Sequence, residues 1–341
     1  MNNTIVGVDL AKELIQVCVY TNKKVHSNEE MTLTQFALWL LNAKPVTIVF
    51  EACGMSNYWK QRATASGHNA QLISAKLVSV VRQNQKTDPN DALAIVQAAH
   101  LPDVKFIAGK TVEQQELQSI KRLRELAVKQ KTAASNQLKG LLSEFNIKGR
   151  CLVDAIESTI EDAENGFCYQ LRLALKTGLE QYLALASAVN AYDDCIAKSV
   201  QTHPECKKLL ALEGVGPLNA INLYIALGCA ELGVFSKGKD VSACIGLTPI
   251  QHSSGGITKL GSIGKYVKNS ILRSQLITGA MSAVNQAVKK EPKTEKDLWI
   301  RGVVGRRGKK CAAVALANKT VRTAFAMLTQ GTEYKAAQLP V

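Results

Sequence analysis

The chain is 341 residues long and 46% hydrophobic, which is enough for two or three domains with buried cores. Its formal net charge is +14, and residues 201–341 hold 20 Lys and Arg against 8 Asp and Glu. This excess favours a polyanionic partner, nucleic acid being the commonest, over a generically basic domain. There is no run of eighteen apolar residues and no C-x-x-C pair among the nine cysteines, and the first ten residues, MNNTIVGVDL, lack the charged and long apolar regions typical of a signal peptide. We therefore expect a cytoplasmic protein with reduced thiols, without a membrane span or a zinc site.

The first hundred residues alternate between short apolar runs and amphipathic stretches. Residues 4–9 and 16–20 are β-rich and lie close in sequence, which predicts a hairpin. Further strands are expected at 46–50 and 70–73, and helices at 33–41, 58–66, 75–84 and 91–100. Strands that alternate with helices predict an α/β layer built on a mixed sheet.

Four carboxylates fall at special places in this pattern. Asp9 and Glu51 each close an apolar run, and Asp88 and Asp91 stand three residues apart just before an apolar helical stretch. Acids at the ends of adjacent buried strands, joined by a pair on one helix face, predict a site for a hard divalent cation, Mg²⁺ or Mn²⁺. The alternative for the pair alone is a helix cap at Asp88 with Asp91 in the first turn. That alternative does not explain Asp9 and Glu51, whose charges would be buried at a cost in free energy without a cation or another partner.

The middle of the chain has a different composition and periodicity. Residues 112–146 contain no Pro, a single Gly and leucines at roughly helical spacing, which predicts a long helix. A second helix is expected over 167–200. Together they predict an antiparallel helical hairpin or coiled coil, which serves either as a spacer or as an oligomerisation arm.

Beyond Pro204, the turn Gly214-Val215-Gly216 lies between two apolar stretches. It is typical of a helix-hairpin-helix, in which glycines let backbone N–H groups approach a phosphate, and a plain tight helix connection is the alternative. Further helices are expected near 266–288 and 311–328.

The segment from Gly246 to Gly256 places His252, Ser253 and Ser254 before two glycines. On composition alone this is a flexible linker, and one His beside one Ser is weak evidence for a nucleophile.

Basic residues are frequent after this segment. We expect several to contact phosphates and to make binding salt-dependent, although a solvated face is the alternative for any one of them. Gly302 and Gly308 make the last cluster loop-like. Trp299, in the same tract, is either a stacking platform or a half-buried core residue. The candidates are Lys259, Lys265, Lys268, Arg301, Arg306, Arg307, Lys309 and Lys310.

Five segments together carry a family resemblance: IVGVDLAKE, FEACG, KTDPNDALA, LEGVGP and GLTPIQHSSGG, in that order. They resemble the DEDD transposases of the IS110 insertion-sequence family, including its IS1111 branch, and the related Piv invertase. The resemblance covers nearly the whole chain. It implies a RuvC-like (RNase H-type) domain at 1–108, a helical coiled-coil or oligomerisation region at 109–203, and a mostly α-helical transposase domain with the helix-hairpin-helix and a catalytic serine at 204–341.

The resemblance also implies a mechanism. Asp9, Glu51, Asp88 and Asp91 would bind divalent metal, and the family's nucleophilic serine falls on Ser254, with Ser253 the less favoured neighbour. Members form homodimers and homotetramers in which the serine of one subunit meets the acids of another. Many use a structured RNA from the element, a bridge RNA or seekRNA, to pair with donor and target DNA.

The expected function is therefore RNA-guided DNA recombination by an insertion-sequence transposase through a covalent phosphoserine intermediate. The alternatives are a RuvC-like metal-dependent junction nuclease, a site-specific DNA invertase without a guide RNA, and a non-catalytic nucleic-acid-binding protein.

Overall fold

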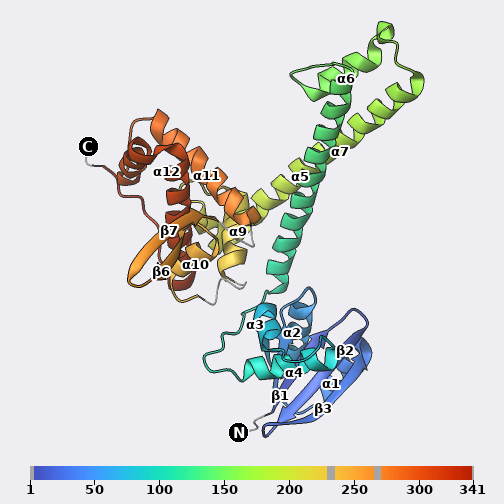
Figure 1. Cartoon of the computed structure of the whole chain (residues 1–341), viewed down its shortest axis with the longest axis vertical. Helices are drawn as coiled ribbons and strands as arrows, with labels where there is room; N and C mark the ends of the chain where they lie inside the picture. Colours follow the sequence, from blue (N-terminus) through green and yellow to red (C-terminus); the bar gives the residue numbers. More distant parts are fainter. Residues whose placement is uncertain (1–3, 229–234, 265–269, 340–341) are drawn as a thin grey trace. The chain divides into compact units, whose positions relative to one another are not determined.

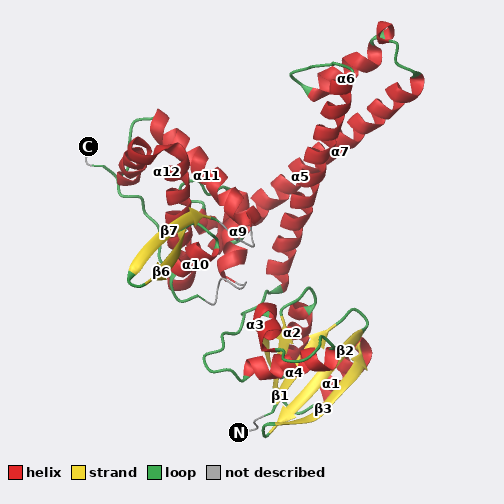
Figure 2. Ribbon diagram, viewed as in Figure 1, coloured by secondary structure: helices red, strands yellow, loops and turns green. Residues whose placement is uncertain are grey.

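A computed structural model describes residues 4–228, 235–264 and 270–339 (Figures 1 and 2). The chain divides into two compact units. One comprises Met1–Gln115, Ala211–Val215 and Asn222–Val341, and the other comprises Glu116–Leu210 and Gly216–Ile221. Within the described residues, no helix is both long and apolar enough to cross a membrane.

The N-terminal part is built on a five-stranded mixed sheet with the order β3-β2-β1-β4-β5. β1 pairs antiparallel with β2 and parallel with β4, β2 pairs antiparallel with β3, and β4 pairs parallel with β5. The predicted mixed sheet and its first hairpin are confirmed, and the order is that of an RNase H-like fold. β3, a polar edge strand, is not predicted by the sequence pattern. The strands are β1 (Ile5–Leu10), β2 (Leu14–Thr21), β3 (Lys24–Thr32), β4 (Thr47–Glu51) and β5 (Asn69–Ile73).

Helices pack on both faces of this sheet. Phe36 and Trp59, from α1 (Leu33–Asn42) and α2 (Ser56–Ala65), share one core with Val8 and Phe50. On the opposite face, α3 (Ala75–Val81) and α4 (Asp88–Ala99) pack against Val49 and its neighbours. Successive strand residues face opposite sides, so Gly7 and Asp9 of β1 lie on the α4 side, as do Val49 and Glu51 of β4.

Two long helices form the middle of the chain, as predicted. α5 (Val112–Glu144) and α7 (Tyr169–Thr202) are linked by the pair between Arg124 and Asp193, with Nε 2.5 Å from Oδ1. Gly178 lets α7 approach α5, because a Cβ there would lie 2.9 Å from Leu138 Cδ2. The short helix α6 (Leu152–Glu161) and a 3₁₀ turn (Ala163–Asn165) connect them, and α6 joins their shared apolar core.

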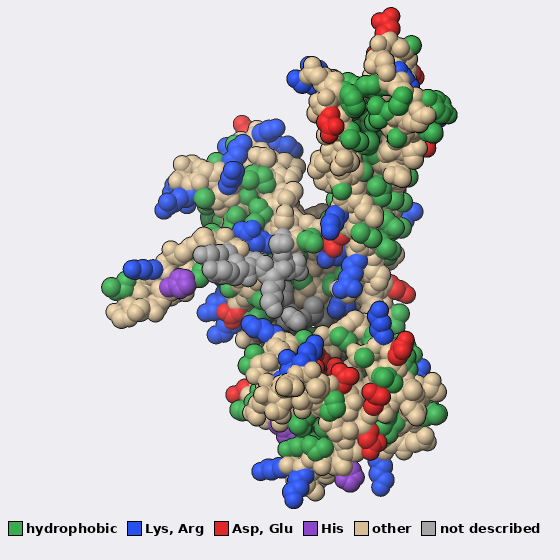
Figure 3. All heavy atoms as spheres, turned by 45° about the vertical axis from the view of Figure 1, so that its right-hand side comes forward, with side chains coloured by type: hydrophobic (Ala, Val, Ile, Leu, Met, Phe, Trp, Pro, Cys, Tyr) green, Lys and Arg blue, Asp and Glu red, His purple; other side chains and the backbone are tan. Residues whose placement is uncertain are grey.

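Apolar side chains remain exposed along these helices. Leu123, Leu126 and Leu183 are 49%, 51% and 44% exposed. Figure 3 shows hydrophobic side chains gathered along the long helices on the face drawn. We call α5, α6 and α7 the arm.

The C-terminal part is mostly helical and carries a separate two-stranded sheet. Its longest helix, α12, begins at Glu295, sixteen residues earlier than predicted. The basic cluster from Arg301 to Lys310 therefore lies on a helix and not in a loop. Glycine interrupts that helix only at Gly308, which has φ +77° and ψ 169°. The elements are α8 (Pro204–Leu209), α9 (Pro217–Gly228), α10 (Gly238–Cys244), β6 (Pro249–Ser254), β7 (Ile257–Ile263), α11 (Ser270–Lys289) and α12 (Glu295–Gln330).

Candidate active site

Asp9 and Glu51 occupy neighbouring positions at one edge of the N-terminal sheet. The parallel register of β1 and β4 pairs Val8 with Phe50, so the residues that follow emerge side by side. Both side chains are half-buried and belong to the face that α4 covers. This placement follows from the register of two parallel apolar strands, which end at neighbouring positions.

Asp88 and Asp91 are brought to the same edge by the packing of α4. α4 lies directly on β1, because a Cβ added to Gly7 would stand only 2.5 Å from Ala92 O and 2.6 Å from Val96 Cγ2. Only glycine permits this approach. Asp88 is exposed in the first turn of α4, whereas Asp91 is buried at 6% exposure.

Burial and neighbouring carboxylates both act on the two strand-end acids. Burial raises the pKa of Asp9, and the negative charges of Asp91 and Asp88 raise it further. Burial also raises the pKa of Glu51, with contributions from Asp9 and Asp91. Lys86 partly offsets both increases. Without a cation, the charged forms of the two strand-end acids are therefore disfavoured.

Two sets of residues that hold this edge together were not found from the sequence. Arg82, just after α3, donates from Nη1 to Asp91 Oδ1 at 2.7 Å. Gln16, the cross-strand neighbour of Asp9, donates to Asn28 at 2.9 Å, and Asn28 donates to the carbonyl of Pro89 at 2.9 Å. These two hydrogen bonds connect β2 and β3 to the start of α4. No local sequence signal marks these residues, because each bond joins separate elements.

The donor set suits a hard divalent cation, although it does not form a closed shell. Among the described residues, no three His, Cys, Asp or Glu side chains are already arranged to hold a metal ion. The carboxylate oxygens are nonetheless the ligands that Mg²⁺ and Mn²⁺ prefer, and their mutual repulsion is what a cation would relieve. Arg82 occupies one oxygen of Asp91 and leaves Oδ2 for a ligand.

Ser254 lies at the end of an exposed β-hairpin and not in a flexible linker. β6 and β7 pair antiparallel, and Ser254 is opposite Ile257. Gly255 and Gly256 form the two-residue turn with φ of +56° and +79°, conformations that suit glycine in a tight hairpin. The Gly-rich composition thus marks a tight turn here, between two strands that pair with each other.

The two serines of the hairpin differ in their surroundings. Ser253 Oγ is 3.3 Å from both Thr258 Oγ1 and Gln251 Nε2. Ser254 lies on the other face, which it shares with the cross-strand pair of His252 and Lys259. Two basic or titratable side chains therefore line the hairpin face that carries Ser254.

The Gly214 turn has a packing role. Gly214 has φ +77°, and a Cβ there would lie 2.6 Å from the carbonyl oxygen of Gly279 in α11. Gly216 is exposed with open space around it, just before α9. Close phosphate approach is therefore sterically open at Gly216, while Gly214 is committed to α11.

The predicted basic residues fall into three groups. Arg301 is engaged internally: its Nε donates to Ala287 O at 2.9 Å, and its Nη2 donates to Lys290 O. Lys265 and Lys268 lie outside the described residues. The others are exposed on β7 and α12: Lys259, Arg306, Arg307, Lys309 and Lys310.

Comparison with known proteins identifies relatives over nearly the whole chain. Residues 6–147 match the sequence model of the IS110 DEDD transposases, described as "Transposase", and residues 206–294 match "Transposase IS116/IS110/IS902 family". The chain is 32% identical over 336 residues to "Transposase for insertion sequence element IS1111A" of Coxiella burnetii, covering 97% of this chain and 91% of that protein. It is also 32% identical over 341 residues to "Probable family 20 transposase" of Pseudomonas aeruginosa, covering 98% and 99%. A more distant relative, at 21% identity over 350 residues and 97% of each chain, is "Pilin gene-inverting protein" of Moraxella lacunata.

Proposed function

The chain belongs to the IS110 family of DEDD transposases, and we propose that it cuts and rejoins DNA with Ser254 and the four acids of the N-terminal sheet edge. It is a DNA-processing enzyme, the transposase of an insertion sequence. The observation that supports the finer mechanism is that Asp9 and Glu51 end neighbouring strands near the start of α4, close enough for the charge of Asp91 to raise both of their pKa values beyond the effect of burial.

The acids serve as ligands for Mg²⁺ or Mn²⁺. When bound, such a cation polarises a scissile phosphate and stabilises the negative charge that develops there. Asp9 and Glu51 supply oxygens from rigid strand ends, and Asp88 and Asp91 supply them from the first turn of α4. Arg82 orients Asp91 through the 2.7 Å hydrogen bond.

Ser254 is the nucleophile. Its Oγ forms a bond to the phosphorus of a DNA strand, the phosphorus–oxygen bond to the leaving sugar breaks, and the serine proton ends on the departing sugar oxygen. The number of phosphodiester bonds is conserved, so the reverse reaction rejoins strands without ATP. Support comes from the exposed position of Ser254 beside a tight turn, with His252 and Lys259 on the same hairpin face to receive a proton or contact a phosphate.

The enzyme assembles as a homodimer and homotetramer through the arm. The exposed Leu123, Leu126 and Leu183 are the type of residue that two helices bury against each other. An exposed hairpin can then present Ser254 to the acids of another subunit.

A structured RNA encoded by the element guides the choice of DNA. Base pairing would supply sequence recognition, and the protein would bind mostly backbone and shape. The excess of Lys and Arg in residues 201–341 supports such a role, because contacts to phosphates need charge more than base-specific groups.

A covalent-adduct assay tests the mechanism. The full chain is incubated with Mg²⁺, labelled DNA carrying the element's ends and target, and RNA transcribed from the element's non-coding flank. Denaturing gels should show a protein–DNA adduct that Ser254→Ala and Asp9→Asn abolish. Ser253→Ala is the matched control and should retain the adduct, since Ser253 lies on the opposite hairpin face.

Two results would support other functions. Strand hydrolysis by Ser254→Ala at the parent rate, with no adduct in the parent, would favour a RuvC-like junction nuclease. Full recombination without any RNA would favour a site-specific invertase, a possibility that the similarity to the pilin gene-inverting protein raises.

A further inference from the structure

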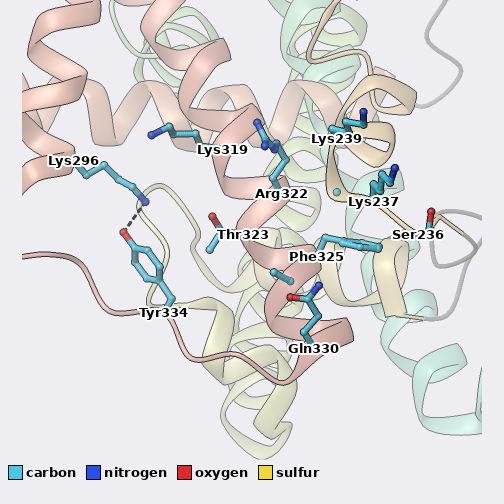
Figure 4. Close-up of a pocket in the computed structure, with 12 residues that line it drawn as sticks. Ser236, Lys237, Lys239, Lys296, Lys319, Arg322, Thr323, Phe325, Gln330 and Tyr334 are labelled. Atoms are coloured by element: carbon cyan, nitrogen blue, oxygen red, sulfur yellow. Dashed lines mark hydrogen bonds between the residues drawn. The ribbon is translucent and has the colours of Figure 1, made fainter.

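A basic cavity of about 710 Å³ lies in the C-terminal part, apart from the acids and from Ser254 along the chain. It is lined by the segment that begins α10, by α12 and by the chain that follows α12. Figure 4 shows Arg322 in the centre, between Lys319 of the same helix and the pair Lys237 and Lys239. Lys296 is at the far end, and no Asp or Glu is among the described residues that line the cavity.

Close packing holds the cations from two segments together. A Cβ added to Gly238 would lie 3.2 Å from the Cα of Arg322, so the start of α10 is in direct contact with α12. Asn318 of α12 donates to Leu247 O at 3.1 Å, which fixes the end of the α10 segment as well. Lys237 and Lys239 are therefore held beside Arg322 by the fold.

Among the residues that the structure describes, most of these cations have no ion-pair partner. Lys296 is the exception, because its Nζ is 2.6 Å from Glu213 Oε2 and 2.6 Å from the hydroxyl of Tyr334. In the described part of the chain, no ion pair involves Lys237, Lys239, Lys319 or Arg322. Four cations facing one hollow create a strong positive potential that favours an anionic ligand.

A second cavity adjoins the first and has a different character. It measures about 540 Å³, and Lys319 and Arg322 line both cavities. Its other walls include Leu247 and Val314, and Trp299, whose ring lies under the Lys319 ammonium at 4.4 Å from the centroid. An apolar pocket next to a row of cations matches the two halves of a nucleotide, the base and its phosphate.

We propose that the two cavities together bind an unpaired nucleic-acid strand. Its phosphates lie along Lys237, Lys239 and Arg322, and one base enters the apolar pocket beside Trp299. A duplex presents its phosphates but keeps its bases stacked and paired, so it can use only the basic cavity. The site extends the proposed function, from which the nucleic-acid ligand follows, but it does not depend on the cleavage chemistry.

The test is binding in EDTA, so that a failure of metal-dependent cleavage cannot affect the result. Fluorescence anisotropy is measured for the full chain with labelled 20-nucleotide single strands, as DNA and as RNA, and with the matching duplexes. The variants are Lys237→Ala/Lys239→Ala and Lys319→Ala/Arg322→Ala. Lys23→Ala/Lys24→Ala is the matched control, since it removes two exposed charges from the β2–β3 turn.

Both cavity variants should weaken single-strand binding by about tenfold or more. The slope of log K against log salt should fall by about 1.4 in Lys237→Ala/Lys239→Ala and by about 0.7 in Lys319→Ala/Arg322→Ala, since each lost single-strand phosphate contact contributes about 0.7. Lys319→Ala/Arg322→Ala should weaken single strands more than duplexes, because it disturbs both cavities. The control should change neither quantity, and the larger effect between DNA and RNA identifies the strand that the site holds.

Unchanged single-strand affinity and salt slope in both variants would overturn the proposal. Equal losses for single strand and duplex would also overturn it, because the apolar pocket would then have no part in binding. All of the substituted side chains are exposed, so the variants should fold, which an unchanged circular dichroism spectrum checks.

Discussion

The contact between Gly7 and α4 controls how the acids meet, and Gly7→Ala should disturb it. The added Cβ would lie 2.5 Å from Ala92 O, whereas ordinary contacts begin at 3.4 Å, so the backbone of α4 must retreat by about 0.9 Å. A backbone carbonyl cannot rotate away as a side chain does. Overpacking of this kind costs about 1–3 kcal/mol of unfolding free energy.

The same retreat should reduce catalysis more than it reduces stability. α4 carries Asp88 and Asp91, while Asp9 remains on β1, so the movement separates ligands of one site. A displacement near 1 Å costs about 100-fold in rate when reacting groups are positioned by the protein. We therefore expect a loss of about two orders of magnitude in Mg²⁺-dependent strand cleavage by a protein that is still folded.

Urea denaturation and single-turnover cleavage measure the two effects. Gly140→Ala is the matched control, because a Cβ at Gly140 of α5 meets no atom within 4 Å. That control should be as stable as the parent or gain up to about 1 kcal/mol from better helix propensity, with unchanged cleavage. Parent-like stability and cleavage in Gly7→Ala would refute the idea that this packing sets the position of the acids.

Three further predictions concern single contacts. Arg82→Ala should cost about 3 kcal/mol in urea denaturation, because it leaves the buried Asp91 without its partner, and an unchanged midpoint would contradict this. Burial alone would raise the pKa of Asp297, but hydrogen bonds from the backbone of Lys293 and Thr294 outweigh it and lower that pKa. The ionised Asp297 carboxylate therefore stabilises the fold above its ordinary pKa of 3.8, and this stabilisation is lost as pH falls through the lower pKa of the folded state. Asp297→Asn should therefore be less stable than the parent at pH 7 in thermal unfolding, with a gap that closes in acid, and a gap independent of pH would argue against this role. Leu123→Lys/Leu126→Lys should reduce the oligomer measured by light scattering, and an unchanged mass would exclude this surface of the arm from the assembly.

The sequence predicts this fold best where burial and periodicity agree. The apolar runs ending in Asp9 and Glu51 could be recognised as strands because both of their faces are covered. β3 was missed because it is a polar edge strand, with a sequence, KVHSNEEMT, that lacks an apolar face. The start of α12 is not predicted because its glycines are typical of a loop, whereas in the structure only Gly308 departs from helical geometry.

In the candidate site, too, local features could be predicted from the sequence and contacts between separate elements could not. Strand ends and the i, i+3 spacing are local signals, so the positions of the four acids could be anticipated. The hydrogen bond of Arg82 and those that run from Gln16 through Asn28 to Pro89 join separate elements, so no local sequence pattern predicts them. The composition around Ser254 predicts a linker because serine and glycine are common in linkers and in hairpin turns alike, and only the strand pairing on either side of Gly255 and Gly256 distinguishes the two.

The central claim, that the four acids gather a divalent cation, is tested most directly by the thermal stability of the protein with and without Mg²⁺. In EDTA at neutral pH, Asp9→Asn/Glu51→Gln should be at least as stable as the parent, because the substitutions remove the buried charges and the repulsion between them, the two causes that raise both pKa values. Millimolar Mg²⁺ should raise the melting temperature of the parent and leave that of the double variant unchanged. An equal rise in both proteins, or no rise in the parent, would contradict the claim.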